Sequence, residues 1–559
     1  GMRATLGQLY LEIPVRNEYA KYYHYGYVYT ALDKARGHTN DDVGQELAPN
    51  AGISIGKLNR YFELHPDGFM PFCAGFYLGS YDRGIQFFAE NDKNWNNADE
   101  NRAIEIRRDA DGTRLNIHFM DVPTEISTPL DLTFGLIVTP LRDIQRERKD
   151  IYNYVAASLR KPESEVNDRR YYEACRDYGF TYARLYARMD GMFGAPRTYS
   201  ASQLADFQRN AKLLAEYGLG YLYYSGWGIS PNIPGCEVFA REMYAEPVKA
   251  RGFGVFTFNL NSTYTDYYLA GVEYMVKNAG AKGVHLDSSQ LYFNILSNEL
   301  DGYGFSRKGR AHGSWPVFAS REFSKRLYTM LNDGSVSPER GVINGGFSYP
   351  MYAFAGFINT KGSYEEYYHM KSIRDIRLDS FLFRSADLLN GVYGCTSWAS
   401  YLKLPITENE FTTLNLLHGI AVSATGTLVY PQNTKEPYGR TSAPQGLLSR
   451  LFHDFNVADA KFWPYYLDDK LADTGNPAVY CTAHLFQGSK ALVILANLNE
   501  KDIDTQIRFD WRKLGLDSKK TIIRDGLLPD ITYPVDADGS CKIPIAAQLY
   551  RILRIEAVK

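Results

Sequence analysis

The feature that most constrains the fold is an alternation of strand-like and helix-like segments from about residue 171 to 465. The helix-like segments are amphipathic, for example at 202–217, 267–278 and 320–331. The strand-like runs are 182–186, 221–224, 255–260, 283–287, 341–345, 357–360, 380–383 or 392–396, and 426–430. About eight β/α units are what a (β/α)8 barrel requires. An open doubly wound sheet is the alternative, but no GxGxxG motif or P-loop is present to support it.

Two β-rich regions flank the alternating part. Residues 1–147 contain short β-favouring runs separated by Asp-Gly and Asn/Asp turns, which is typical of antiparallel sheets, and we interpret them as a truncated β-sandwich. A charged linker follows over 148–170, then the barrel over 171–465, and short strands return over 466–559. The sequence therefore predicts a multidomain α/β plus all-β protein: a central (β/α)8 TIM barrel between an N-terminal and a C-terminal β-sandwich.

Charge and cysteine content exclude several function classes. The 62 Lys and Arg residues nearly balance the 64 Asp and Glu residues, so nothing indicates a nucleic-acid or anionic-membrane partner. The six cysteines lie far apart without a CxxC motif, which argues against a zinc or iron–sulfur site. No apolar run approaches the ~18 residues that a transmembrane helix needs. We predict no metal and no cofactor.

The compartment is predicted from the first residues rather than from the cysteines. Six scattered cysteines neither require nor exclude disulfides. Gly1 stands ahead of Met2, as a residue left by tag removal does. We therefore expect a periplasmic or extracellular protein whose signal peptide has been removed.

The stretch Gly283-Val284-His285-Leu286-Asp287 is an apolar run that ends in a carboxylate. In a parallel barrel the last residue of such a strand lies at the carboxyl end, where barrels place their chemistry. The alternative is that Asp287 caps a following helix, because Asp-Ser-Ser is also good capping material. The surrounding β/α units favour the functional interpretation.

The ends of the other predicted strands carry groups suited to a neutral polyol. Amides and an Arg form hydrogen bonds with hydroxyls, and aromatic rings stack on a pyranose face. The 44 tyrosines of the chain include many more than one site uses, so most must belong to the core and the strand surfaces. The predicted substrate-binding residues are Tyr224, Trp227, Asn259, Asn344, Lys361, Arg384, Asp387 and Trp398. Any one of them could instead be solvated or cap a helix.

Glycosidic cleavage normally needs two carboxyl groups. Asp287 is the first candidate, and the long segment after it, 288–316, contains Glu299 and Asp301 as candidates for the second. Asp387 and Asp190 are reserves. His285 and His312 do not make a metal site by themselves, and we expect His285 to point into a packing layer, away from the neighbours of Asp287.

Two blocks of the chain resemble glycoside hydrolase family 123 and its relatives. Residues 78–95 (LGSYDRGIQFFAENDKNW) are similar to an Arg-Gly, Phe-Ala-Glu and Trp run in the N-terminal β-domain of that group. Residues 283–287 (GVHLD) are similar to its fourth barrel strand, which ends in aspartate. The resemblance covers the back part of the first β-domain and the barrel.

The resemblance implies an exo-acting, retaining β-N-acetylgalactosaminidase in which the 2-acetamido group of the substrate is the nucleophile. In that family an adjacent Asp-Glu pair divides the work: Asp steadies the acetamido nitrogen and Glu protonates the leaving oxygen. Asp287 matches the Asp, but Ser288 stands where the Glu should be, and serine is no general acid near neutral pH. Either the acid comes from the following segment, or the substrate and mechanism differ, or the protein binds sugars without cutting them.

Two functions of different classes remain. The first is a glycoside hydrolase of polysaccharide degradation that acts on a terminal neutral or N-acetylated sugar, with an N-acetylhexosaminidase-like activity as one form. The second is a non-catalytic carbohydrate-binding protein on a glycosidase scaffold, which Ser288 favours. The expected partner is in both cases a carbohydrate.

Overall fold

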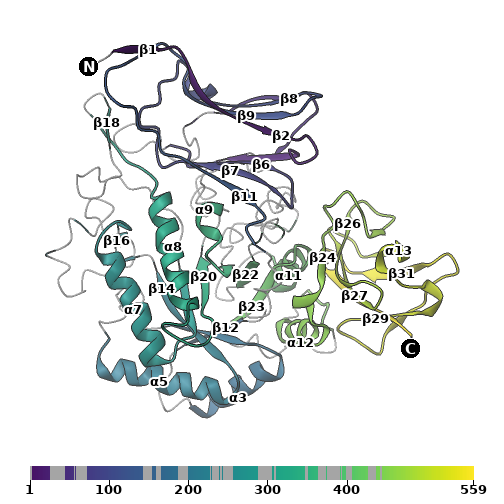
Figure 1. Ribbon diagram of the computed structural model, residues 1–559. Helices are drawn as coiled ribbons and strands as arrows, with labels where there is room; N and C mark the ends of the chain where they lie inside the picture. The colour runs from purple at the N-terminus through teal and green to yellow at the C-terminus, as the bar shows by residue number, and fades with distance from the viewer. Residues whose placement is uncertain are drawn as a thin grey trace.

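The computed structural model describes residues 3–25, 45–55, 57, 72–142, 154–158, 165–186, 199–226, 228–229, 238, 242, 256–257, 259–287, 305–307, 310–346, 351–362, 373, 389, 391, 393–397, 406–425, 436–440 and 444–558. Figure 1 shows three parts: an N-terminal β-domain, a central barrel with helices around it, and a C-terminal β-domain beside the barrel.

The N-terminal β-domain consists of two facing antiparallel sheets. The four-stranded sheet has the order β2-β9-β8-β5 and the five-stranded sheet the order β11-β7-β6-β3-β4, while β1 pairs with β10. Between the sheets, Phe134 stacks on Phe87 of β7 and Phe119 of β9, with ring centroids 5.6 and 5.4 Å apart. The strands are β1 (Ala4–Leu6), β2 (Leu9–Val15), β3 (Tyr22–Tyr25), β4 (Gln45–Glu46), β5 (Gly52–Ile55), β6 (Gly75–Gly79), β7 (Gly84–Phe88), β8 (Ile104–Arg108), β9 (Thr113–Met120), β10 (Thr124–Ile126) and β11 (Gly135–Thr139).

Eight parallel strands form the central sheet. They pair in the order β12-β13-β14-β17-β20-β21-β22-β23, and β23 pairs in turn with β12, so that the sheet closes as a barrel. The strands are β12 (Tyr154–Ser158), β13 (Tyr182–Tyr186), β14 (Gly220–Gly226), β17 (Gly283–Asp287), β20 (Val342–Gly346), β21 (Thr360–Gly362), β22 (Tyr393–Ser397) and β23 (Ala421–Thr425). The helices between or after them include α3 (Glu165–Asp177), α5 (Ala201–Glu216), α7 (Tyr264–Ala279), α8 (Val317–Asn332), α9 (Tyr352–Ala355), α11 (Glu408–Leu417) and α12 (Gln445–Phe455).

The general prediction, β/α alternation between two β-sheet regions, is confirmed, but several predicted strands are wrong. The first barrel strand, β12, lies inside the predicted linker 148–170. The run 255–260 contributes no barrel strand; β16 (Phe256–Thr257) pairs antiparallel with β15 (Gly228–Ile229). For the seventh strand the alternative 392–396 agrees with β22, and 380–383 lies outside the described residues. The last strand, β23, precedes the predicted run 426–430, which also lies outside them.

The C-terminal β-domain packs against the barrel through helices α11 and α12. Its sheets have the orders β24-β26-β27-β32-β29-β30 and β25-β28-β31. Leu416 of α11 and Phe455 of α12 share one buried cluster with Leu492 and Ile494 of β27. The strands are β24 (Lys461–Trp463), β25 (Ala472–Asp473), β26 (Val479–Phe486), β27 (Lys490–Asn497), β28 (Ile503–Phe509), β29 (Thr521–Asp525), β30 (Thr532–Tyr533), β31 (Ser540–Ile545) and β32 (Tyr550–Ala557), with a short helix α13 (Trp511–Leu514).

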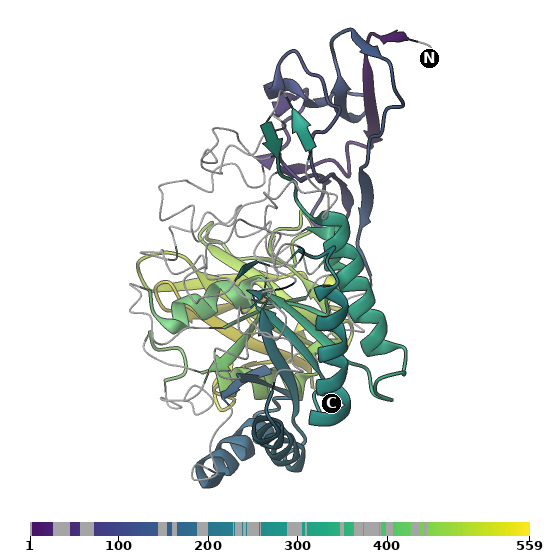
Figure 2. The same ribbon diagram turned by 90° about the vertical axis from the view of Figure 1, so that its left-hand side faces the viewer.

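The N-terminal β-domain contacts the end of the barrel at which the strands finish. Helix α8 follows β17 and helix α9 follows β20, so the N-termini of both helices lie at that end. The ring of Phe88 in β7 packs against Phe318 in the first turn of α8, with centroids 5.4 Å apart. Figure 2 shows the β-domain beyond this end of α8 from a second direction.

Candidate active site

Strand β17 ends at Asp287, so the predicted strand 283–287 is confirmed. Gly226 of β14 is the register partner of Asp287, and Asn344 of β20 is that of His285. Because the barrel strands are parallel, their carboxyl ends meet at one end of the barrel. Position 287 therefore lies at the end where barrels of this kind hold their active sites. The side chain of Asp287 is outside the described part, and its role stays a prediction.

The contacts of neighbouring residues in β14 show which face of this strand points into the barrel. The hydroxyl of Tyr221 donates to the carbonyl oxygen of Ala279 in α7 at 2.8 Å, and the hydroxyl of Tyr223 lies 2.9 Å from that of Tyr199, just before α5. These two tyrosines therefore face the surrounding helices. Because successive residues of a strand point to opposite faces, Tyr224 faces the barrel interior.

A buried polar layer crosses the barrel at the level of Tyr224. The strand register aligns Tyr224 with His285, His285 with Asn344, and Asn344 with Thr360. The Tyr224 and His285 rings stack with centroids 4.8 Å apart and planes at 16°. Arg184 of β13 adds its guanidinium, which lies 5.6 Å from the Tyr224 ring centroid and places Nη1 3.4 Å from His285 Nε2. Such a layer is unusual, because barrel interiors are usually filled by branched apolar side chains.

The electrostatics of this layer keep His285 neutral. Burial lowers the pKa of His285 well below its ordinary value, the nearby positive charge of Arg184 lowers the pKa further, and a hydrogen bond with Asn344 opposes both. A neutral imidazole can accept one hydrogen bond and donate another. Asn344 also donates from Nδ2 to the hydroxyl oxygen of Thr360. The layer thus joins one cationic group to neutral donors and acceptors.

The expected direction of the His285 side chain is wrong, although the side chain is packed in a buried layer as expected. We expected it in a packing layer that points away from the neighbours of Asp287. Positions 285 and 287 instead belong to the same face of β17, because residues two apart on a strand share a face. His285 contacts Arg184 and Tyr224 in the barrel interior. The polar layer therefore lies two residues before Asp287 along β17, on the same face of the strand and deeper in the barrel.

Asn259 does not lie at the end of a barrel strand, which corrects the prediction for this residue. It is buried between β16 and α7, where its Nδ2 donates to the Glu242 carbonyl oxygen at 3.2 Å and its Oδ1 accepts from the Asn261 amide at 3.0 Å. These bonds order the turn that precedes α7. The error follows from assigning the run 255–260 to the barrel.

The remaining predicted residues divide into three groups. Tyr224 and Asn344 are brought together with His285 in the polar layer. Lys361 lies in β21, but only its backbone is described. The others lie outside the described residues, so their predicted roles are untested: Trp227, Glu299, Asp301, Arg384, Asp387, Trp398 and Asp190.

Arg184 and Thr360 were not predicted as site residues. The signal for Arg184 is its place at the centre of the strand Tyr-Ala-Arg-Leu-Tyr, where period-2 alternation puts it on one face with the two tyrosines. A long cation in the middle of an otherwise apolar strand indicates a polar interior. Thr360 offers no such signal, because a threonine is an ordinary strand residue.

Within the described ranges, no group of three or more His, Cys, Asp or Glu side chains is placed to hold a metal ion. None of the helices in those ranges has both the length and the apolar character that a membrane crossing requires.

Comparison with known proteins gives a family match in the C-terminal part of the chain and a likeness in fold to solved structures over most of its length. Residues 445–555 match the family model for the C-terminal domain of glycoside hydrolase 123. The GH36 alpha-galactosidase AgaA from Geobacillus stearothermophilus, in complex with stachyose, superposes with a TM-score of 0.57 at 11% identity, over 98% of this chain and 76% of that chain. The maltogenic alpha-amylase AmyB from Thermotoga neapolitana gives a TM-score of 0.50 at 12% identity, over 73% and 99%. No curated protein matches the sequence.

Proposed function

We propose that this chain, a glycoside hydrolase family 123-like protein, hydrolyses the glycosidic bond of a terminal neutral or N-acetylated sugar at the carboxyl end of its barrel. The observation that carries the proposal is the buried layer of Arg184, Tyr224, His285 and Asn344 directly below strand position 287. Convergent polar groups on a barrel floor suit a ligand rich in hydroxyl groups. The family match in the C-terminal β-domain supports the same class of protein.

In the proposed reaction Asp287 stabilises positive charge that develops near the anomeric carbon, or orients the 2-acetamido group of an N-acetylated substrate. Ser288 does not protonate the leaving oxygen near neutral pH, so the general acid is assigned to Glu299 or Asp301 of the following segment. Because His285 is neutral, it adds no positive charge beside the proposed position of the Asp287 carboxylate.

Substrate binding is assigned to the residues at the strand ends, without Asn259. Tyr224 and Asn344 provide a hydroxyl and an amide from the polar layer. Trp227, Lys361, Arg384, Asp387 and Trp398 keep their proposed roles on the strength of their positions in the sequence. An aromatic ring that stacks on the sugar contributes about 1 kcal/mol beyond the area that it buries.

A non-catalytic carbohydrate-binding protein is the second candidate, and Ser288 is the observation that favours it. Such a protein would use the same polar layer to hold a sugar but would lack the acid that cleavage needs. The two candidates therefore differ in turnover and agree in binding.

An aryl glycoside panel separates the two functions. The panel contains N-acetylgalactosaminide and N-acetylglucosaminide first, then galactoside and glucoside, with release of the aryl group and binding of the free sugars measured in parallel. We expect turnover of at least one N-acetylated or neutral glycoside. Binding of a sugar with no turnover across the panel would contradict the hydrolase and support the binding protein. Neither binding nor turnover would contradict both.

A further inference from the structure

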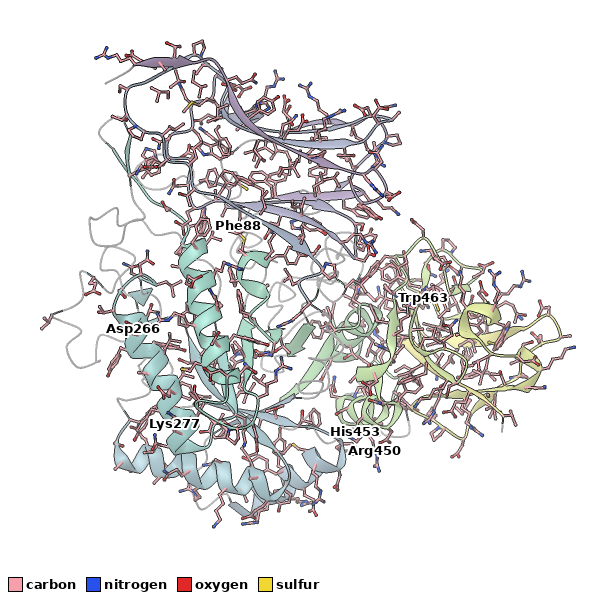
Figure 3. All side chains as sticks on the ribbon, in the orientation of Figure 1. Phe88, Asp266, Lys277, Arg450, His453 and Trp463 are labelled. Carbon is pink, nitrogen blue, oxygen red and sulfur yellow. The ribbon has the colours of Figure 1, made fainter. Side chains whose placement is uncertain are left out.

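One face of the segment around β7 is directed at the barrel. Gln86 and Phe88 are in β7, and Glu90 follows two residues later. Residues at i, i+2 and i+4 of an extended segment share a face. All three contact the start of a helix that surrounds the barrel. Gln86 contacts Tyr352 of α9, and both Phe88 and Glu90 contact Phe318 of α8. Figure 3 labels Phe88 where β7 meets the end of α8.

Helix α8 receives its N-terminal cap from the β-domain. The residue at its own N-cap position, Pro316, makes no side-chain hydrogen bond to the helix. A carboxylate oxygen of Glu90 instead accepts the amide of Phe318 at 3.0 Å. The first amides of a helix have no partner within it, and the positive end of the helix dipole favours a carboxylate, so this contact performs the work of a cap.

Helix α9 is capped in the same way. The residue at its N-cap position, Met351, also makes no side-chain hydrogen bond. The amide of Tyr352 donates to Oε1 of Gln86 at 2.9 Å. Gln86 is fully buried, so the bond is shielded from water, and leaving the amide without its acceptor would be costly.

Further hydrogen bonds connect the residues before α8 to the N-terminal β-domain. The amide of Trp315 donates to the Glu90 carbonyl oxygen at 2.9 Å, and Nδ2 of Asn91 donates to the Ser314 hydroxyl at 2.7 Å. The Trp315 indole N–H donates to the Phe72 carbonyl oxygen. The chain from Ser314 to Phe318 is thus fixed by backbone and side-chain bonds to another domain.

These contacts lie on the two connections that leave the candidate site. Helix α8 ends the connection that starts after Asp287, and helix α9 lies in the connection that starts after β20, the strand of Asn344. We propose that Gln86 and Glu90 are positioning residues of the active site, which fix these two connections by capping α8 and α9 from the N-terminal β-domain. This inference rests on the proposed function for its catalytic consequence, whereas the capping itself is independent of any activity.

Amide hydrogen exchange of the full-length protein tests the capping. The substitutions Glu90→Met and Gln86→Met keep the length of the side chain but remove the oxygen that accepts the helix amide. The substitution Glu90→Gln keeps an oxygen that can accept this hydrogen bond. Glu12→Gln, an exposed carboxylate of β2, is the matched control. We expect Glu90→Met to speed exchange in peptides that cover 314–320 by about fivefold or more, and Gln86→Met to do so around 351–355, with Glu90→Gln and Glu12→Gln near wild type. Unchanged exchange in both Met variants would overturn the inference.

Steady-state kinetics on the best substrate of the glycoside panel tests the positioning. At a temperature where every variant is folded, Glu90→Met should lower kcat by about tenfold while KM stays within about threefold, and Glu90→Gln should recover most of the loss. A Met variant with faster exchange but unchanged kcat would overturn the positioning role. If the wild type turns over no glycoside, the proposed function fails, and the exchange result alone decides whether the β-domain fixes the two connections.

Discussion

His285 and Glu90 illustrate how burial changes the chemistry of single residues in this protein. Burial lowers the pKa of His285 well below its ordinary value, so the imidazole stays neutral. Burial raises the pKa of Glu90 from 4.5 to about 7, and the hydrogen bond from the Phe318 amide opposes that shift. The group that caps α8 therefore changes its charge near neutral pH, which gives the cap a pH dependence.

Replacing Glu90 with Gln should remove one source of pH-dependent stability. Below about pH 4.5 Glu90 is protonated in both states. Between pH 4.5 and about 7 the unfolded chain releases the proton while folded Glu90 keeps it, so the free energy of unfolding falls as pH rises. The fall is on the order of 1–3 kcal/mol. Urea unfolding at pH 5 and pH 8 should show a smaller difference for Glu90→Gln than for wild type and the Glu12→Gln control. Equal differences in all three proteins would contradict the assignment.

At the scale of single residues, the sequence predicted the strand end at Asp287 and placed Tyr224 and Asn344 near the ends of barrel strands. It did not predict Arg184, because a mid-strand Arg gains meaning only when the neighbouring strands are aligned in register. The sequence marks the block that contains Glu90 only through a family resemblance, whereas the capping of a helix in another domain depends on a contact between residues 228 positions apart.

Barrel strand β17 begins with Gly283, where the adjacent strand β20 leaves no room for a side chain. Gly283 has a φ of 151°, which side-chain-bearing residues rarely adopt. A Cβ atom at this position would lie 1.9 Å from the backbone oxygen of Val342, the register partner of Gly283 in β20. The glycine thus lets the strands of Asp287 and Asn344 pair closely.

The substitution Gly283→Ala should therefore destabilise the protein by about 3 kcal/mol or more, because backbone atoms of an adjacent strand must move. Gly52→Ala is the control, since Gly52 is also in a strand and has no atom within 4 Å of the added Cβ. Denaturant midpoints of the two variants give the comparison. A Gly283→Ala protein as stable as the Gly52→Ala protein would show that β17 and β20 are not packed this closely.

Element prediction succeeded where periodicity was strong and failed where segments were short. The helix at 202–217 agrees closely with α5. Strand β12, Tyr-Val-Ala-Ala-Ser, was missed because two alanines and a serine give little β signal. The run 255–260 was misassigned because a short apolar run does not reveal whether its strand is parallel or antiparallel.

In the whole molecule, the N-terminal β-domain packs against the end of the barrel that holds the candidate site. The C-terminal β-domain packs against the side of the barrel (Figure 1). The alternation of elements was enough to predict this order of parts. The predicted boundary between linker and barrel is too late in the chain, because β12 already belongs to the barrel, and the other domain boundaries stay a prediction. Which faces meet was not predictable, because the contacts of β7 with α8 and α9 join segments that are distant in the sequence.

The central claim is that the protein cleaves a glycosidic bond at the end of β17, and the kcat of Asp287→Asn tests it most directly. Asn caps a helix about as well as Asp, so a purely structural Asp287 would make this change nearly silent. If Asp287 stabilises developing positive charge, the variant should keep its fold and its sugar affinity while kcat falls by a factor on the order of 10²–10⁴. An active wild type with a fully active Asp287→Asn variant would contradict the proposed site.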